Sequence, residues 1–284
     1  RNSLPKASLD RHILEWAIAL SGDPSVPSHE IAQAAADLPA WPGLAALRRN
    51  FERALYRENP PAKDVIAAFA KSTPQTPVGA AILARVNVAQ GNAQAAHTVL
   101  APLWRKAVMS ADDEQAIISE FGSLLTADDH FHRMSAMLYA ERPASAGRVA
   151  KLANSEPLFA AWSAAIRKDA KTAGFVKVVP AEAQKLAGYQ FAKARWLRKT
   201  GKLKDAAKVM AEAPQDAASL IDPDAWWNER RILARSLWDA GQPKLAYKTA
   251  SMHAAQSPTS AAEAEFHAGW IALRALKDPK LAEA

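Results

Sequence analysis

Hydrophobic residues recur at three- and four-residue spacing through the C-terminal part of the chain, a pattern that predicts amphipathic helices. The first of these helices is expected to begin at Asp222, a capping residue followed by proline, and to end before Gly241. A second covers residues 243–253, and a third begins with a capping box at Ser260. Residues 222–281 are therefore predicted to fold as helix, turn, helix, turn, helix.

The hairpin within this segment recurs along the chain at fixed spacing. An alanine that precedes arginine is followed by a glycine seven residues later, and by a second alanine after five more. Small residues let antiparallel helices approach closely, and glycine lets the chain reverse with positive φ. A degenerate fourth copy has Trp270, Lys277 and Ala282 at these positions, and the last three copies start about 36 to 40 residues apart, as in helical-hairpin repeats. The clear copies are Ala84–Gly91–Ala96, Ala194–Gly201–Ala206 and Ala234–Gly241–Ala246.

The rest of the chain also has the pattern of helices joined by short turns. Residues 170–179 are the exception, as the least helical stretch and the expected break in the repeat register. We therefore predict an all-α protein with tetratricopeptide-like helix pairs, divided into residues 1–169 and residues 170–284. Among the earlier helical segments are 9–20, 28–38, 44–58, 65–71 and 154–168.

Composition narrows the function classes. Apolar residues make up 49% of the chain, enough for a core, whereas only 11 residues are glycine, few for a turn-rich all-β fold. The chain has no cysteine, which excludes disulfides, thiol catalysis and thiolate metal sites. It also has no run of eighteen apolar residues, so no membrane span is expected. Because it begins at Arg1, we expect that a leader was removed or that the chain starts inside a longer protein.

The net charge of +7 is concentrated in one segment. Residues 167–208 hold twelve lysines or arginines and three acidic residues, a local charge of +9 that leaves the remainder at −2. Such a segment could face an anionic polymer or an acidic surface, although a solvated helix face is the simpler interpretation.

Possible metal ligands gather at Asp128, Asp129, His130 and His132. Residues two apart on a helix point in different directions, and the two aspartates suit the first turn of a helix. The pair Glu263–His267 has no third ligand near it in sequence, so a surface pair is the better interpretation. We predict no metal site.

Motifs for nucleophilic catalysis and for binding phosphate are absent. No serine lies in a Gly-x-Ser-x-Gly setting, and no glycine-rich loop could cradle phosphate. No carboxylate stands in a recognisable frame for glycoside cleavage. We predict that this chain is non-catalytic and needs no cofactor.

Tryptophans near arginines are the remaining candidates for binding. Aromatic faces beside guanidinium groups can stack on sugars or bases, but large rings can equally fill the space between helical hairpins. The candidates for contact with glycan or with another domain are Trp196, Arg195, Arg198, Trp226, Trp227, Arg230 and Arg231.

The segment WWNERRILARSLWDAGQPKLAYKTASMHAAQSPTSAAEAEFHAGWIALRAL closely resembles the helical N-terminal portion of the soluble lytic transglycosylases of alphaproteobacteria. The resemblance extends to DRHILEWAIA, LPAWPGLAALRRNFERAL, the segment from PLWRKAVM to SAGRVAKL, and RWLRKTGKLKDAAKVMAEAP, in the order expected for the family. It implies a right-handed superhelix of antiparallel helix pairs, open or curled into a ring, that seats a lysozyme-like catalytic domain C-terminal to this chain.

The family cleaves peptidoglycan in the periplasm, between N-acetylmuramic acid and N-acetylglucosamine and without water. Its catalytic glutamate lies in a Glu-Ser motif, and no Glu-Ser pair occurs here, so no catalytic residue is assigned. The resemblance implies the scaffold portion alone, with peptidoglycan and the catalytic domain as partners and without a nucleic acid. Two alternatives are a non-enzymatic tetratricopeptide-like adaptor and an RNA-binding helical solenoid.

Overall fold

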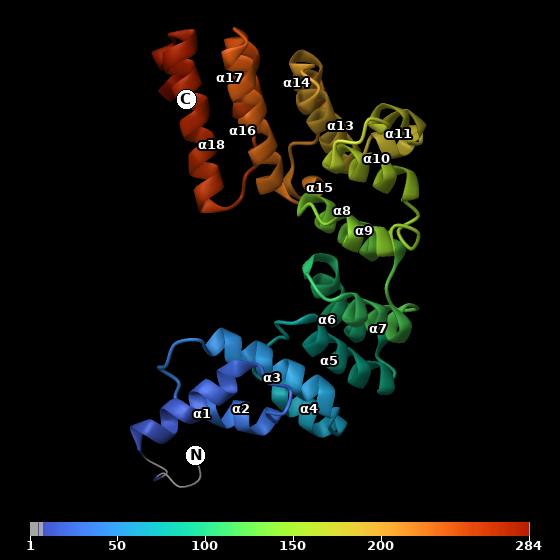
Figure 1. The fold of residues 1–284 in the computed structure, drawn as a ribbon, viewed down its shortest axis with the longest axis vertical. Helices are drawn as coiled ribbons and strands as arrows, with labels where there is room; N and C mark the ends of the chain where they lie inside the picture. The colour runs from blue at the N-terminus through green and yellow to red at the C-terminus, as the bar shows by residue number, and fades with distance from the viewer. Residues whose placement is uncertain (1–4, 6–7, 284) are drawn as a thin grey trace. The chain divides into compact units, whose positions relative to one another are not determined.

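The computed structural model describes Pro5 and residues 8–283, and within this part of the chain every regular element is a helix (Figure 1). The all-α prediction is confirmed. The chain forms two compact units, residues 1–129 and residues 130–284, and helix α8 (Ala127–Tyr139) contains the boundary. The division expected from the sequence, at residue 170, falls inside the second unit and stays a prediction.

The first unit is a set of short antiparallel helices in which α3 packs against α1, α2 and α5. Trp16, Ile31 and Leu47 are buried in one apolar cluster, and Leu55 and Ile82 in a second. The helices before α8 are α1 (Leu9–Ser21), α2 (Ser28–Asp37), α3 (Leu44–Glu58), α4 (Ala62–Phe69), α5 (Pro77–Ala89), α6 (Ala93–Lys106) and α7 (Ala111–Phe121).

The second unit contains two long hairpins, and α14 and α18 each pack against both helices of the second hairpin, α16 and α17. The first hairpin consists of α13 and α14. The elements are α9 (Pro143–Val149), α10 (Glu156–Arg167), α11 (Thr172–Val178), α12 (Ala181–Gln184), α13 (Ala187–Lys199), α14 (Leu203–Glu212), α15 (Ala217–Leu220), α16 (Pro223–Asp239), α17 (Pro243–Ser251), α18 (Pro258–Ile271), the π-helical turn η1 (Ala272–Leu276) and α19 (Pro279–Glu283).

A cluster of four aromatic rings joins helices α8, α10, α13 and α16. Tyr139, at the end of α8, lies edge to face with Trp162 of α10 and with Phe191 of α13, at centroid distances of 4.7 and 4.9 Å. Phe191 in turn meets Trp226 of α16 at 5.2 Å. Edge-to-face contacts between buried rings add stability beyond that gained from burying their apolar area. This aromatic cluster therefore helps to fix the spacing of the helices.

The repeated glycines end their helices as the spacing predicts. Gly91, Gly201 and Gly241 have φ of 77°, 78° and 69°, in the left-handed region. After each glycine, the next amide donates to the carbonyl five residues before it, at 2.8 to 2.9 Å, which is the Schellman pattern. The two alanines of all three copies are fully buried where the paired helices meet. The predicted hairpins are therefore confirmed.

Turns of this kind also occur without glycine. Lys277, the glycine position of the degenerate copy, has φ of 57°, but the amide after it donates to Ala272 O, six residues back, so its turn differs from the glycine turns. Glu141, between α8 and α9, has φ of 56°, and the amide after it donates to Met137 O at 2.8 Å, as in the glycine turns. Met134 and Ala146, at the two alanine positions around Glu141, are fully buried. The alanine–glycine–alanine spacing does not reveal this copy, because two of its three positions hold other residues.

The expectation that residues 170–179 are the least helical stretch was wrong over residues 172–178, which form α11. Thr172 Oγ1 donates to Asp169 O, and the Asp169 carboxylate accepts from the Lys171 amide, so polar contacts start this helix. Val176 and Val179 are buried. Burial of this kind overrides the low intrinsic helix propensity of valine.

Gly188 allows the close approach of α13 to α10, because a Cβ at this position would overlap the buried Trp162 ring. We expect Gly188→Ala to lower the free energy of unfolding by about 1–3 kcal/mol, the usual cost of overpacking. The control, Gly174→Ala on α11, meets nothing within 4 Å and should raise it by about 0.5–1 kcal/mol. Urea unfolding measures both, and a Gly188→Ala protein as stable as wild type would contradict the tight packing.

Candidate functional site

The seven candidate residues from the sequence lie on α13 and α16 in the second unit. Trp226 and Trp227 are fully buried, so neither ring offers a face to a sugar. The Trp226 Nε1 donates to Tyr139 OH at 2.8 Å, and the Trp227 Nε1 donates to Glu263 Oε2 at 2.9 Å. Both rings fill space between helices, the second of the two roles considered from the sequence. Trp196 is half-buried, with Lys202 Nζ 5.7 Å from its ring centre.

Three of the four candidate arginines form ion pairs with carboxylates of other elements in the second unit. Arg195 contacts Glu141, Arg198 contacts the buried Glu229, and Arg231 contacts Glu263. The Arg195 hydrogen bond lowers the pKa of Glu141. The pKa of Glu263 is lowered first by the Trp227 hydrogen bond, and Arg231 adds to that shift. These guanidinium groups therefore connect α13 to the α8–α9 turn and to α16, and α16 to α18.

Arg230 differs from the other three. It is 1% exposed, and among the residues that the structure describes it makes no ion pair. Its Nη2 donates to Met210 O at 2.8 Å and its Nη1 to Thr249 O at 3.5 Å, both neutral acceptors. Burial lowers the pKa of Arg230 to about 10. A charged group buried without a counter-charge is costly, and that makes its surroundings the first place to seek a ligand.

A pocket of about 410 Å³ opens beside Arg230, between α14 and α17. Three exposed lysines line it, Lys204, Lys208 and Lys248, together with one exposed carboxylate, Glu212. The lysines were not among the sequence candidates. Their spacing in the sequence is a signal that could have found them, because pocket residues lie at i, i+3, i+4 and i+7 along each of the two helices. Only the packing of α14 on α17 brings these two sets of residues together. The apolar lining of the α14–α17 pocket consists of Ala207, Ala211, Leu245 and Met252.

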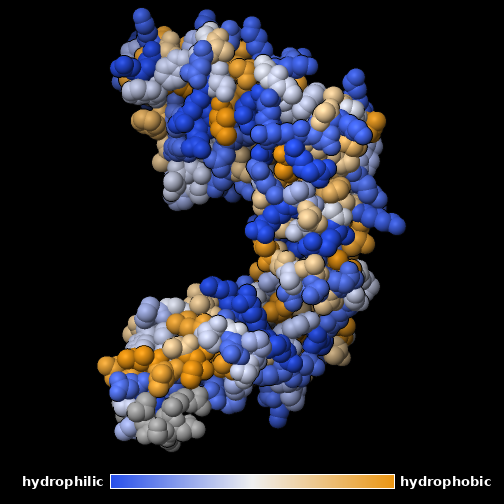
Figure 2. All heavy atoms as spheres, in the orientation of Figure 1, coloured by the Kyte–Doolittle hydropathy of each residue, from blue (hydrophilic) through white to orange (hydrophobic). Residues whose placement is uncertain are grey.

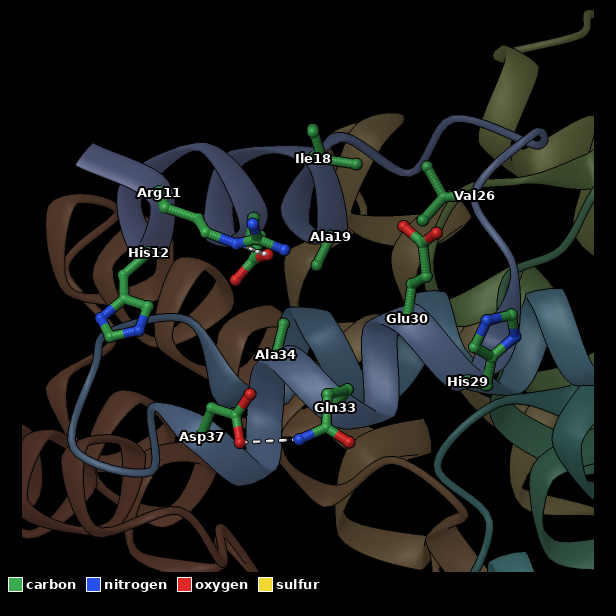
Figure 3. A pocket seen from close by; sticks show the side chains of 11 residues that line it. Arg11, His12, Ile18, Ala19, Val26, His29, Glu30, Gln33, Ala34 and Asp37 are labelled. Carbon is green, nitrogen blue, oxygen red and sulfur yellow. Dashed lines mark hydrogen bonds and ion pairs between the residues drawn. The ribbon is translucent and has the colours of Figure 1, made fainter. Parts of the chain in front are cut away.

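A second pocket, of about 470 Å³, lies in the first unit between α1 and α2 (Figure 3). Several of its polar side chains already pair within their own helix. Arg11 Nε contacts Glu15 Oε1 at 2.8 Å, and Gln33 Nε2 donates to Asp37 Oδ1 at 2.7 Å. Unlike the α14–α17 pocket, this one holds acidic and basic groups in similar number and no fully buried charge.

Apolar side chains also reach the surface of the first unit. Figure 2 shows hydrophobic residues gathered over its α1 end, where Leu9, Ile13 and Leu14 of α1 are exposed.

The aspartates of the possible metal cluster serve the start of α8. Asp129 accepts hydrogen bonds from Thr126 N at 2.8 Å, Thr126 Oγ1 at 2.7 Å, His97 Nε2 at 2.9 Å and Arg105 Nε at 2.8 Å. Thr126 Oγ1 in turn accepts from the Asp129 amide, a reciprocal cap. No group of three residues suited to a metal occurs within Pro5 and residues 8–283. His267 of the other pair hydrogen-bonds to Glu263 O and Arg235.

The Asp129 cap predicts a dependence of stability on pH. Burial raises the pKa of Asp129, but the hydrogen bonds from Thr126, His97 and Arg105 outweigh it and lower the pKa below its ordinary value of 3.8. A carboxylate with a lowered pKa in the folded state stabilises that state above the unfolded pKa, and this stability is lost as the pH falls. Asp129→Asn should cost about 1.5–3 kcal/mol at pH 7, and less as the pH falls below 3.8.

Urea unfolding of wild type and Asp129→Asn at pH 7 and pH 3 measures this difference. Asp128→Asn is the matched control, because the Asp128 side chain is 62% exposed and contacts Arg105 at the surface. Its effect should stay small at both pH values. An Asp129→Asn penalty that is the same at pH 3 as at pH 7 would contradict the assignment.

Compared with protein-family models, curated proteins and solved structures, the chain matches none of them. Within the described part of the chain, no helix combines the length and the apolar character that a membrane crossing needs. The observations that bear on function are therefore the paired helices, the ion pairs between them and the cationic α14–α17 pocket.

Proposed function

We propose that this chain is the α-superhelical scaffold of a periplasmic lytic transglycosylase, which positions glycan strands of peptidoglycan for a lysozyme-like catalytic domain. The observation that carries the proposal is the sequence resemblance over residues 226–276. Those residues cover α16 from its fourth residue, and all of α17, α18 and η1, so the resembling segment spans nearly the whole hairpin and the helix that packs on it.

The finer architecture is part of the same proposal. We infer that the hairpins stack into a right-handed superhelix, because each hairpin has the same turn geometry and buries small residues where its helices meet. Repeats that contact mainly their neighbours form solenoids. In the second unit, Arg195 and Arg198 of α13 pair with Glu141 of the α8–α9 turn and with Glu229 of α16, and stacked hairpins would use such contacts.

The scaffold contributes by orientation in this proposal. A glycan strand held against a rigid wall of helices loses its freedom before the chemical step, which lowers the entropic part of the barrier at the catalytic domain. Cleavage between N-acetylmuramic acid and N-acetylglucosamine belongs to that domain. We therefore expect the chain alone to bind peptidoglycan and to release no glycan fragments from it.

Co-sedimentation of the purified chain with isolated murein sacculi tests the proposal. Arg195 and Arg198 hold inter-helix ion pairs, so the charge test uses exposed lysines of the basic segment instead. Replacing Lys168, Lys171 and Lys177 with glutamine should weaken retention. The matched control has the same loss of charge in the first unit, at Lys63, Lys71 and Lys106, and should be retained like wild type. If wild type stays in the supernatant at low salt, the proposal fails.

A non-enzymatic adaptor is the second candidate, favoured by one observation. Phe266, Trp270 and Leu273 form an exposed apolar stripe along α18 and η1, and the Phe266 and Trp270 rings stack with centroids 6.0 Å apart. Such a surface suits a protein partner. Absence of sacculus binding together with salt-resistant capture of a protein through this stripe would favour the adaptor. Salt-sensitive retention of RNA would instead favour an RNA-binding solenoid.

A further inference from the structure

The α14–α17 pocket is built by two helices that use the same spacing. On α14 the lining residues are Lys204, Ala207, Lys208 and Ala211, and on α17 they continue the same spacing from Leu245 through Lys248 and Thr249 to Met252, just beyond the helix. Residues at these intervals share one face of a helix, so each helix turns a face with lysines toward the pocket. Figure 1 shows α14 and α17 as neighbours in the second unit, and the two helices are in contact.

The floor of this pocket is charged. Arg230 reaches it from α16 and is the only lining residue that is both charged and buried, while the lysines stand at the rim. The lining carries four cationic groups and one carboxylate, Glu212. The guanidinium has five N–H donors, and the two acceptors assigned to it are neutral carbonyl oxygens. An anion in the pocket would supply the missing counter-charge.

The size and walls of the pocket indicate an organic anion. A volume of about 410 Å³ is far larger than a single inorganic ion needs, and ligand pockets of small organic molecules fall in this size range. Ala207, Ala211, Leu245 and Met252 give it apolar walls, which can pack against methylene groups. Planar carboxylates match the fork of a guanidinium, and the lysine rim can hold further carboxylates.

We propose that the α14–α17 pocket binds a short peptide or similar organic ligand with two or more carboxylate groups. One carboxylate pairs with Arg230 at the floor, and the others contact Lys204, Lys208 and Lys248 at the rim. The chemical class of the ligand does not depend on the proposed function, but the source of the ligand does. In a murein scaffold the ligand is the stem peptide of peptidoglycan, and otherwise it is an acidic segment of a protein.

Isothermal titration calorimetry on the whole chain tests the pocket with defined probes. The probes are the stem tripeptide of peptidoglycan, the all-L peptide Ala-Glu-Glu with both termini blocked, its uncharged counterpart Ala-Gln-Gln blocked in the same way, and glucose 6-phosphate as an organic anion without a carboxylate. Both acidic peptides should bind, Ala-Gln-Gln should not, and binding should weaken as salt is raised. Stem tripeptide binding stronger than that of Ala-Glu-Glu identifies murein as the source, and the reverse order identifies a protein segment.

Variants place the binding in this pocket. Arg230→Met should weaken binding of the acidic peptides by about 10- to 100-fold, the range for losing a buried charge-assisted hydrogen bond. The Lys204→Gln, Lys208→Gln, Lys248→Gln triple variant should weaken it about tenfold. The control variant at Lys63, Lys71 and Lys106 loses the same charge and should bind like wild type. Circular dichroism checks that Arg230→Met folds, and the lysine triple variant tests the pocket without changing any buried residue.

Four outcomes would overturn the proposal: binding of Ala-Gln-Gln as tight as that of Ala-Glu-Glu, unchanged binding in both pocket variants, preference for glucose 6-phosphate over every carboxylate probe, or binding of none of the peptides. The result separates from the proposed function. Sacculi that sediment the chain while no acidic peptide binds would remove the pocket and keep the scaffold. Acidic peptides that bind while sacculi do not would keep the pocket and remove the scaffold.

Discussion

Replacing Trp226 with alanine is expected to lower the free energy of unfolding by about 3–5 kcal/mol, the cost of removing a large ring from a packed core. The ring is fully buried, lies edge to face with Phe191 at 5.2 Å and donates from its Nε1 to Tyr139 OH at 2.8 Å. Its loss opens a cavity and leaves the buried Tyr139 hydroxyl without this donor. Urea unfolding followed by circular dichroism measures the change.

Two controls separate the contributions of Trp226. Trp226→Phe keeps a ring in the aromatic cluster but removes the N–H donor. It should cost less than the alanine substitution, and the difference measures the free energy contributed by the ring contacts. Trp270→Ala removes a ring that is 44% exposed, so its cost should be below about 1 kcal/mol. Equal losses for Trp226→Ala and Trp270→Ala would contradict a structural role confined to the buried ring.

The hairpins were predictable because local chemistry dictates them. A helix that reverses at once needs a residue with positive φ, and glycine at position 91, 201 or 241 marks that need in the sequence. Glu141 adopts the same positive φ, although a glutamate in the sequence does not indicate a turn. The energetic cost of this conformation is offset by tertiary contacts, among them the ion pair with Arg195. Sequence spacing detects such a turn only where the marker residue is present.

The candidate site was predictable only in part. Arginines beside tryptophans were visible on α16, but their spacing could not tell that Trp226 and Trp227 face other helices while Arg230 reaches a pocket. Nor could it tell that Lys204 and Lys248, far apart in the sequence, share that pocket, because the crossing of α14 and α17 depends on the packing of both on α16. Long-range packing decides which charges are paired and which remain available.

Glu52 of α3 is the other residue whose loss should be severe. Its side chain is fully buried and accepts hydrogen bonds from Gln75 N at 2.9 Å, Thr76 N at 2.7 Å, Thr76 Oγ1 at 2.7 Å and Arg48 Nε at 2.9 Å. Thr76 is the N-cap of α5, so this one carboxylate fixes the start of α5 against α3. Glu52→Ala leaves the two buried Thr76 donors without their acceptor and removes the partner of Arg48, which should cost about 3–5 kcal/mol.

The control for Glu52→Ala is Glu15→Ala, because Glu15 also accepts from an arginine four residues before it, at 2.8 Å, but its side chain is 25% exposed whereas that of Glu52 is fully buried. Helix pairs of this spacing contribute about 0.3–0.5 kcal/mol, so the two alanine substitutions should differ several-fold in urea unfolding. Glu52→Gln keeps the shape but sets an amide N–H₂ against some of the same donors, and its cost should fall between the two. Similar small losses for Glu52→Ala and Glu15→Ala would mean that the α5 cap holds without the carboxylate, since burial alone would then keep α3 and α5 together.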